Sequence, residues 1–413
     1  MKMKAILAGV ILMMSSVSLF AQNYNQLSGQ SLNPNVITTA VPFVSIAPDA
    51  RGGSMGDCGV SSEADVYSMH YNPAKYTYLK EDLSVGLGYS PWLHNLVPDM
   101  HLAYLAFAKK LNPESAIAAT LRYFSCGEIT FRDENGNSLG DYKPNEWAID
   151  ATYSRMLTDY LSGAVAGRFI YSNLTQGQGE GSFPGWSVAA DVAVYYKRPL
   201  ELRNMDAEFA WGICVNNIGS KVSYRSTSVD KDFIPTTLRL GPSLKLDLDE
   251  YNSLTFMVDV TKLLVPTPPL YKRDDNGQII TDENNNLVIE EGMSDDVSVM
   301  VGIIHSFYDA PGYSYNDYGE KVGLGKFYEE LCEYNLGFGA EYWYNNVFSV
   351  RAGYFNETAL KGNRKYITLG AALKYNVFGL DVSYLVPVNG TVGTNPLENT
   401  LRFNLTYNLA ASK

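Results

Sequence analysis

One short segment of this sequence carries the residue types of a hydrolase nucleophile. Gly52, Ser54 and Gly56 match the G-x-S-x-G pattern, in which a serine stands on a sharp turn between a strand and a helix. Pro48 lies where that strand would have to run, and no histidine belongs to a pattern that would tie it to Ser54 as a general base. We therefore expect no catalytic residue and no enzymatic activity.

The histidines and acidic residues are not spaced like the ligands of a metal ion. No two histidines are three or four positions apart, the spacing that places two imidazoles on one helical face. The run that begins at Asp133 imitates a calcium loop, but Ser138 and Pro144 stand where a glycine and a glutamate are needed. We interpret the acidic group at 282–291 as a solvated loop, with loose binding of a divalent cation as the alternative. The sequence thus predicts no metal site and no cofactor.

The composition excludes several classes of protein. Only 18% of the 413 residues are charged, and the net charge is −12, so a nucleic-acid backbone would repel the chain. Beyond the first 20 residues, no apolar run approaches the roughly 18 residues that a membrane-spanning helix needs. The 35 glycines and 30 tyrosines favour many short strands joined by turns. These features predict an all-β protein that does not bind nucleic acid.

The first residues resemble a secretory signal peptide. Lys2 and Lys4 precede an apolar stretch, and Ala21 suits cleavage before Gln22, so we assign residues 1–21 to the signal. The signal predicts an exported protein, and because no cysteine follows the cut, we expect no lipid anchor at the new amino terminus. Disulfides are possible in an exported protein, but the spacing of the four cysteines favours none of the three possible pairings. They are Cys58, Cys126, Cys214 and Cys332.

From about Asp82 onward, apolar residues alternate with small or polar ones over segments of roughly ten residues. In the last segment, for example, Leu405 and Tyr407 share one face and Asn404 and Thr406 the other. Charged residues occupy the centre of the polar face in several segments, among them Asp150, Asp191 and Asp259. A wet or plugged lumen suits this polar face, and the apolar face then needs lipid, although a soluble sandwich remains an alternative. We expect Trp92, Trp186 and Trp343 in an interfacial aromatic girdle.

The alternation predicts an outer-membrane β-barrel of fourteen antiparallel strands across residues 82–410. The even number and the alternation of short with longer connections are typical of bacterial outer-membrane barrels, and they place the longer connections outside the cell. The expected strands are 82–92, 99–111, 114–131, 143–158, 160–172, 184–198, 205–218, 233–248, 251–263, 331–344, 346–358, 364–376, 377–387 and 397–410.

One predicted extracellular connection, 264–330, is far longer than the others. Within it, 295–308 reads as a helix, because Ser294, Asp295 and Asp296 can cap its start and apolar residues follow at helical spacing. Connections of this length more often serve a function than not, so this loop is our candidate for contact with a partner protein. The candidate contact residues are Pro266, Pro268, Pro269, Tyr271, Met300, Ile304, Phe307 and Tyr308.

Residues 22–81, before the barrel, differ in composition and carry a specific resemblance. The run from Ile37 to Tyr76 reads "ITTAVPFVSIAPDARGGSMGDCGVSSEADVYSMHYNPAKY". It resembles the amino-terminal signature of the PorV family of the type IX secretion system of Bacteroidetes. The stretches Gly339–Glu357 and Lys361–Pro387 resemble the same family. The shorter Asn72-Pro73-Ala74 pattern is shared with fatty-acid transporters of the FadL type, whose amino-terminal segment folds into the barrel as a hatch.

The resemblance implies a FadL-like barrel with an extracellular docking role. Proteins of this family collect exported proteins that carry a C-terminal signal domain as they leave the translocon barrel. They deliver this cargo to an attachment complex, where a sortase removes the signal domain. The implied partners are therefore the translocon, the sortase and other attachment-complex proteins, the cargo and outer-membrane lipid. The alternative function is a FadL-type channel for hydrophobic small molecules.

For residues 22–81 we expect a hatch inside the barrel. Glycines permit close turns, prolines restrict the backbone, and Asp49 can pair with Arg51 in a polar lumen. Whether this hatch is a fixed plug or a gate for a small apolar ligand stays open. The candidate hatch residues are Asp49, Arg51, Gly52, Gly53, Asn72, Pro73 and Ala74.

Overall fold

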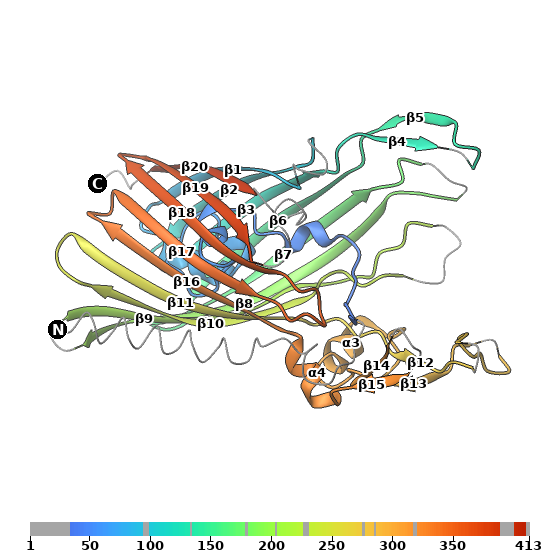
Figure 1. Cartoon of the computed structure of the whole chain (residues 1–413). Helices are drawn as coiled ribbons and strands as arrows, with labels where there is room; N and C mark the ends of the chain where they lie inside the picture. The colour runs from blue at the N-terminus through green and yellow to red at the C-terminus, as the bar shows by residue number, and fades with distance from the viewer. Residues whose placement is uncertain are drawn as a thin grey trace.

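The computed structural model of the chain is a closed barrel (Figure 1). It describes residues 34–93, 99–132, 134–177, 181–202, 205–225, 231–274, 277–284, 286–316, 320–388 and 400–409. Fourteen antiparallel strands pair in chain order, and the last closes the wall by pairing with the first. The fourteen-stranded barrel predicted from the alternation is confirmed. The predicted signal peptide lies outside the described residues.

The strand boundaries follow the alternating segments closely. One predicted strand, 114–131, is too long, because it ends at Ser125 and residues 129–132 pair with 138–142 in a separate ribbon. The barrel strands are β1 Leu83–Pro91, β2 His101–Asn112, β3 Ser115–Ser125, β6 Asn145–Met156, β7 Leu161–Asn173, β8 Gly185–Leu202, β9 Met205–Gly219, β10 Thr237–Asp247, β11 Asn252–Leu263, β16 Tyr334–Tyr344, β17 Phe348–Asn356, β18 Lys365–Tyr375, β19 Phe378–Pro387 and β20 Leu401–Leu409.

The two faces of the wall differ as lipid outside and polar groups inside require. Val165 and Leu405, on the outer face, are 60% and 46% exposed, whereas Asp150 and Asp191, on the inner face, are buried. Inside, Arg168 of β7 pairs with both of these aspartates, so the inner charges neutralise one another across neighbouring strands. The barrel thus presents an apolar outer band around a polar, filled interior.

The aromatic residues of the outer wall are not those predicted. Only Trp186 of the three expected tryptophans is strongly exposed, because Trp343 is buried and Trp92 packs against apolar side chains inside the barrel. Trp147 instead stacks on Tyr171 at the end with long connections, and Trp211 stacks on Tyr196 toward the other end. Trp343 lies near the end of β16, as an interfacial residue would, but its side chain points into the barrel. Trp343 shares the inner face with Glu341.

Among the described residues, the strands and helices that lie in the connections between barrel strands are all at one end of the barrel. β4 (Ile129–Arg132) and β5 (Ser138–Tyr142) form a ribbon that projects beyond the wall in Figure 1. Between β11 and β16 lies the insertion, residues 264–333, of which 317–319 and three other residues are not described. It contains β12 Leu270–Tyr271, β13 Ile289–Glu291, α3 Val299–His305, β14 Tyr313–Tyr315, β15 Lys321–Gly323 and α4 Lys326–Cys332.

The helix predicted at 295–308 exists but is shorter. α3 begins after Ser298, whose side chain makes no capping hydrogen bond, so the predicted caps at Ser294, Asp295 and Asp296 are wrong. Its apolar residues Met300 and Ile304 face outward, at 62% and 57% exposure. None of the helices among the described residues is long and apolar enough to span a membrane.

Residues 34–81, which we call the luminal segment, begin at the rim, where Asn35 donates to Pro268 O of the insertion, and continue into the barrel, where Figure 1 draws them in blue. They form only short helical turns: η2 Pro42–Ser45, α2 Ala50–Gly53, η3 Ser68–His70 and η4 Pro73–Tyr78. Hydrogen bonds from Lys110 of β2 to Leu79 and from Ser162 of β7 to Ala74 hold the end of this segment near the short turns. The end of the luminal segment therefore lies in the half of the barrel that carries the short turns.

Candidate functional sites in the lumen and at the outer rim

An ion-pair network fastens the luminal segment to the barrel wall. Arg51 donates through Nη2 and Nε to both carboxylate oxygens of Glu341 on β16, at 2.7 and 3.0 Å, and through Nη1 to Asp65 at 3.0 Å. Glu341 also accepts from Arg351 of β17 at 2.7 Å. Because a bidentate guanidinium–carboxylate pair fixes both distance and orientation, Arg51 locks the segment to two wall strands.

The expected pair between Asp49 and Arg51 does not form. Asp49 instead accepts a hydrogen bond from the backbone N–H of Gly52 at 2.8 Å and so caps the short helix α2. Arg51 donates to Asp65 and to the backbone carbonyl of Glu63. Asp49 and Arg51 are close in sequence, but they have different partners in the structure, because Asp49 caps α2 and Arg51 pairs with Asp65.

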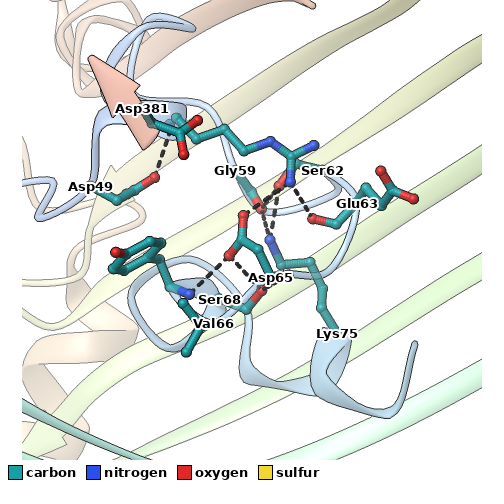
Figure 2. A network of polar contacts seen from close by, with 12 residues as sticks. Asp49, Gly59, Ser62, Glu63, Asp65, Val66, Ser68, Lys75 and Asp381 are labelled. Carbon is teal, nitrogen blue, oxygen red and sulfur yellow. Dashed lines mark hydrogen bonds and ion pairs between the residues drawn. The ribbon is translucent and has the colours of Figure 1, made fainter. Parts of the chain in front are cut away.

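Asn72 and Lys75 hold the turns of the luminal segment together. The Asn72 amide donates to the carbonyls of Val60 and of Val194 on β8, while its oxygen accepts from Ala74 N and caps η4, which begins at Pro73. The Lys75 ammonium donates to Gly59 O at 2.7 Å and Ser62 Oγ at 2.9 Å, as Figure 2 shows. The predicted Asn-Pro-Ala pattern is thus a junction between the segment and the wall.

The glycines of the segment allow close packing. A Cβ on Gly52 would lie 2.1 Å from the Tyr71 hydroxyl, and one on Gly53 would lie 2.6 Å from Arg402 Nη1. Ser54 is buried, and its hydroxyl donates to Arg51 O, so the serine of the apparent nucleophile motif serves the end of α2. All four cysteines are unpaired.

Above the luminal segment, toward the long connections, lies a cavity of about 590 Å³. Phe43, Trp92 and Phe124 line one part of it, and Asp259 and Glu357 another. Arg364 also lines the cavity, and its side chain is 54% exposed, so the cavity reaches the outer surface. We call it the vestibule.

Two arginines that the sequence did not single out, Arg239 of β10 and Arg402 of β20, line the vestibule. His70 lies between the guanidinium groups of Arg122 and Arg239, at 3.1 and 3.3 Å, and Arg402 of β20 lines the same space. The alternation assigns Arg239 and Arg402 to the inner face. It cannot assign them to one site, because β10 and β20 are far apart in sequence and are not neighbours in the wall, so that only closure of the barrel lets both line one cavity.

The insertion is fixed to the outside of the barrel rim by a buried charge cluster. Lys262 lies on the outward face of β11, yet it is 1% exposed, because Glu330 and Glu333 at the end of α4 cover it. Lys361 pairs with Glu333 from the loop between β17 and β18. Burial and the charge of Glu333 raise the pKa of Asp309, which lies in the same cluster, to about 6. The ammonium of Lys262, 2.5 Å from Glu333, places a positive charge beside these carboxylates.

The candidate contact residues of the insertion divide into two groups. Met300, Ile304, Phe307 and Tyr308 are 45–62% exposed, whereas Pro266 and Pro269 are buried and Pro268 and Tyr271 are half-buried. The sequence analysis missed Phe327 and Leu331 of α4, which are 78% and 50% exposed and one helical turn apart. The exposed apolar surface of the insertion therefore comes from α3 and α4, and the prolines shape its base.

Several solved structures resemble this fold at low sequence identity. The Ralstonia pickettii toluene transporter TbuX is 12% identical over 89% of this chain and 98% of its own, with a TM-score of 0.43. The Pseudomonas putida toluene transporter TodX is 12% identical over 89% and 99%, with a TM-score of 0.46. A Pseudomonas aeruginosa FadL homologue is 11% identical over 91% and 99%, with a TM-score of 0.39. No curated protein matches the sequence.

A family model matches residues 29–270, more than half of the chain, and its description is type IX secretion system protein PorV. The matched region covers the luminal segment and β1 to β11, including the Asn72 junction and the Arg51 anchor. The closed wall with an apolar outer face agrees with an integral protein of the outer membrane. The chain therefore belongs to the PorV family and is an outer-membrane component of the type IX secretion system.

Proposed function

We propose that this barrel binds exported proteins through their C-terminal signal domain at the translocon and carries them to the sortase and other proteins of the attachment complex. The observation that carries this proposal is the insertion, which is anchored outside the rim and exposes the apolar residues of α3 and α4. Exposed apolar patches rimmed by polar residues are typical of protein interaction sites. The role is one of binding and delivery, with no chemistry of its own.

The luminal segment supports this role by closing the barrel. We propose that it is a fixed plug held by the Arg51 and Asn72 contacts, so that cargo stays on the outer face and does not pass through the lumen. On this proposal, the other candidate hatch residues stabilise the turns of the plug and do not form a gate. They are Asp49, Gly52, Gly53, Pro73 and Ala74.

The test compares recovery of cargo from outer membranes. A deletion of residues 264–330 should leave a folded, heat-modifiable barrel that no longer co-purifies exported proteins retaining their signal domain. The double variant Met300→Ser and Ile304→Ser should reduce recovery about tenfold. The double variant Ile279→Ser and Leu287→Ser removes apolar residues that are 46% and 49% exposed elsewhere in the insertion, and it serves as control. Unchanged recovery of exported proteins with the deletion variant would show that the insertion does not bind cargo.

A second candidate, a channel for hydrophobic small molecules, is favoured by the vestibule, which has a volume usual for small-ligand sites. Such a channel should retain its role when the insertion is deleted. Purified protein in liposomes should then take up a labelled apolar compound equally well with and without residues 264–330. On the proposed function, the plugged barrel takes up none above protein-free liposomes.

A further inference from the structure

Two buried arginines at the inner end of the vestibule have weak partners. Arg239 is 8% exposed, makes one hydrogen bond, to His70 at 3.3 Å, and has no ion pair with any residue that the structure describes. Arg402 is 2% exposed, and its contacts to Gly53 O and Asp57 Oδ1 are long, at 3.5 and 3.8 Å. Nε of each makes no hydrogen bond to the described residues.

Two other luminal arginines show what a satisfied guanidinium looks like in this barrel. Arg168 pairs with Asp150 and Asp191, and Arg122 donates to the carbonyls of Phe43, Val44 and Ile46 at 2.6–3.1 Å. Burying a cation without such partners is costly. Arg239 and Arg402 differ from the satisfied pair in lining the vestibule, so an anion that enters from outside can supply what the protein does not.

The other residues that line the vestibule indicate which kind of molecule carries the anion. Asp57, Asp259 and Asn335 line the same cavity, and each has an oxygen that accepts no hydrogen bond from the described residues, while Phe43 and Phe124 offer apolar surface. An acyl chain would desolvate those acceptors without donating to them. A polypeptide end brings a carboxylate, backbone N–H donors and side chains together, and so matches the cations, the acceptors and the aromatic surface at once.

We propose that the vestibule binds the C-terminal carboxylate of a polypeptide, with Arg239 and Arg402 as its anion-binding pair. This inference rests on the proposed function, because exported proteins with a C-terminal signal domain are the chains that would present such an end to the outer face. The domain body would contact the insertion, and its last residues would enter the vestibule between the β17–β18 loop and the luminal segment.

The test uses the full-length barrel in lipid nanodiscs and one signal domain prepared with either a free C-terminal carboxylate or a C-terminal amide. We expect the carboxylate form to bind the wild-type barrel at least tenfold more tightly than the amide form. Arg239→Gln should lower the affinity for the carboxylate form to that for the amide and leave amide binding unchanged. Arg225→Gln, at an exposed arginine that does not line the vestibule, should change neither.

The outcomes separate this inference from the proposed function. Equal affinity for both forms on the wild-type barrel would overturn the carboxylate site while leaving cargo binding intact, and this comparison needs no variant to fold. Failure of the carboxylate form to bind at all would overturn both. Stronger competition by palmitate than by the free-acid C-terminal peptide would also overturn the inference, because it would identify a lipid as the ligand.

Discussion

The backbone of the luminal segment packs directly against a glycine of the wall. A Cβ on Gly353 of β17 would lie 2.1 Å from Gly56 N and 2.2 Å from the carbonyl carbon of Met55, so the backbone of the segment lies directly on this residue. Neither group is the flexible end of a side chain that could move aside. Position 353 must therefore be a glycine if the luminal segment is to pack against β17.

Gly353→Ala should therefore destabilise the plugged barrel. Overpacking of this kind costs about 1–3 kcal/mol, and the segment or the strand must shift to relieve it. Gly167→Ala on the outer face of β7 is the matched control, because nothing lies within 4 Å of its added Cβ. Urea unfolding from lipid vesicles measures both. Equal stability of the two variants would contradict the close contact.

Arg51 is the residue on which the seating of the luminal segment depends most. Arg51→Gln should lower the free energy of local opening of residues 49–65 by on the order of 3 kcal/mol, because it breaks a buried pair to Glu341 and a half-buried pair to Asp65. Hydrogen exchange of that segment is the measurement. Lys80→Gln, which removes a pair to Glu63 made by a lysine 67% exposed, should change it by less than about 1 kcal/mol. Similar exchange in both variants would show that Arg51 is not the anchor.

At the scale of elements, the insertion depends on one outward-facing lysine. Lys262 occupies a position that the alternation of β11 assigns to lipid, and it is buried only because α4 folds over the rim. Without Lys262, Glu330 would have no cation within ion-pair distance among the described residues, while Glu333 would keep Lys361. The helices that expose Met300, Ile304 and Phe327 are held in place by this cluster.

Lys262→Met should consequently free the insertion while sparing the barrel. Loss of the buried pairs should reduce the protection of 299–332 from hydrogen exchange by on the order of 3 kcal/mol, with the wall strands unchanged. Lys326→Met, at a lysine 56% exposed and paired with Glu291, is the control and should have little effect. Protection that survives in Lys262→Met would mean that apolar contacts alone fix the helices.

The sequence predicts the elements that follow from the alternation of apolar and polar residues. It does not predict contacts that depend on the direction of a side chain in a helical turn or on the closure of the barrel. Period-two alternation was enough for all fourteen wall strands, because each strand meets lipid on one side and the lumen on the other. The predicted caps of α3 were wrong because the helix begins only after Ser298. The predicted Asp49–Arg51 pair was wrong because Asp49 accepts a hydrogen bond from Gly52 N and caps α2. Arg239 and Arg402 were on the predicted inner face, but their meeting at one cavity depends on closure of the barrel.

For the molecule as a whole, the apolar outer band is the feature that fixes its place in the outer membrane. Val165, near the middle of β7 and 60% exposed, faces this band. Val165→Arg should destabilise the barrel in lipid vesicles by about 2–4 kcal/mol, as charges do at the bilayer midplane. Leu287→Arg, in the insertion, should be nearly neutral. An equal effect of both substitutions in a vesicle unfolding titration would contradict the assignment of the outer face.

The most direct test of the central claim compares one exported protein with and without its C-terminal signal domain. Both forms are produced in cells whose barrel carries an affinity tag, and the outer membranes are solubilised for capture of the barrel. The account predicts that the form with the signal domain is captured with the barrel and that the form without it stays in the unbound fraction. Capture of both forms in equal yield, or of neither, would contradict a barrel that accepts cargo through that domain.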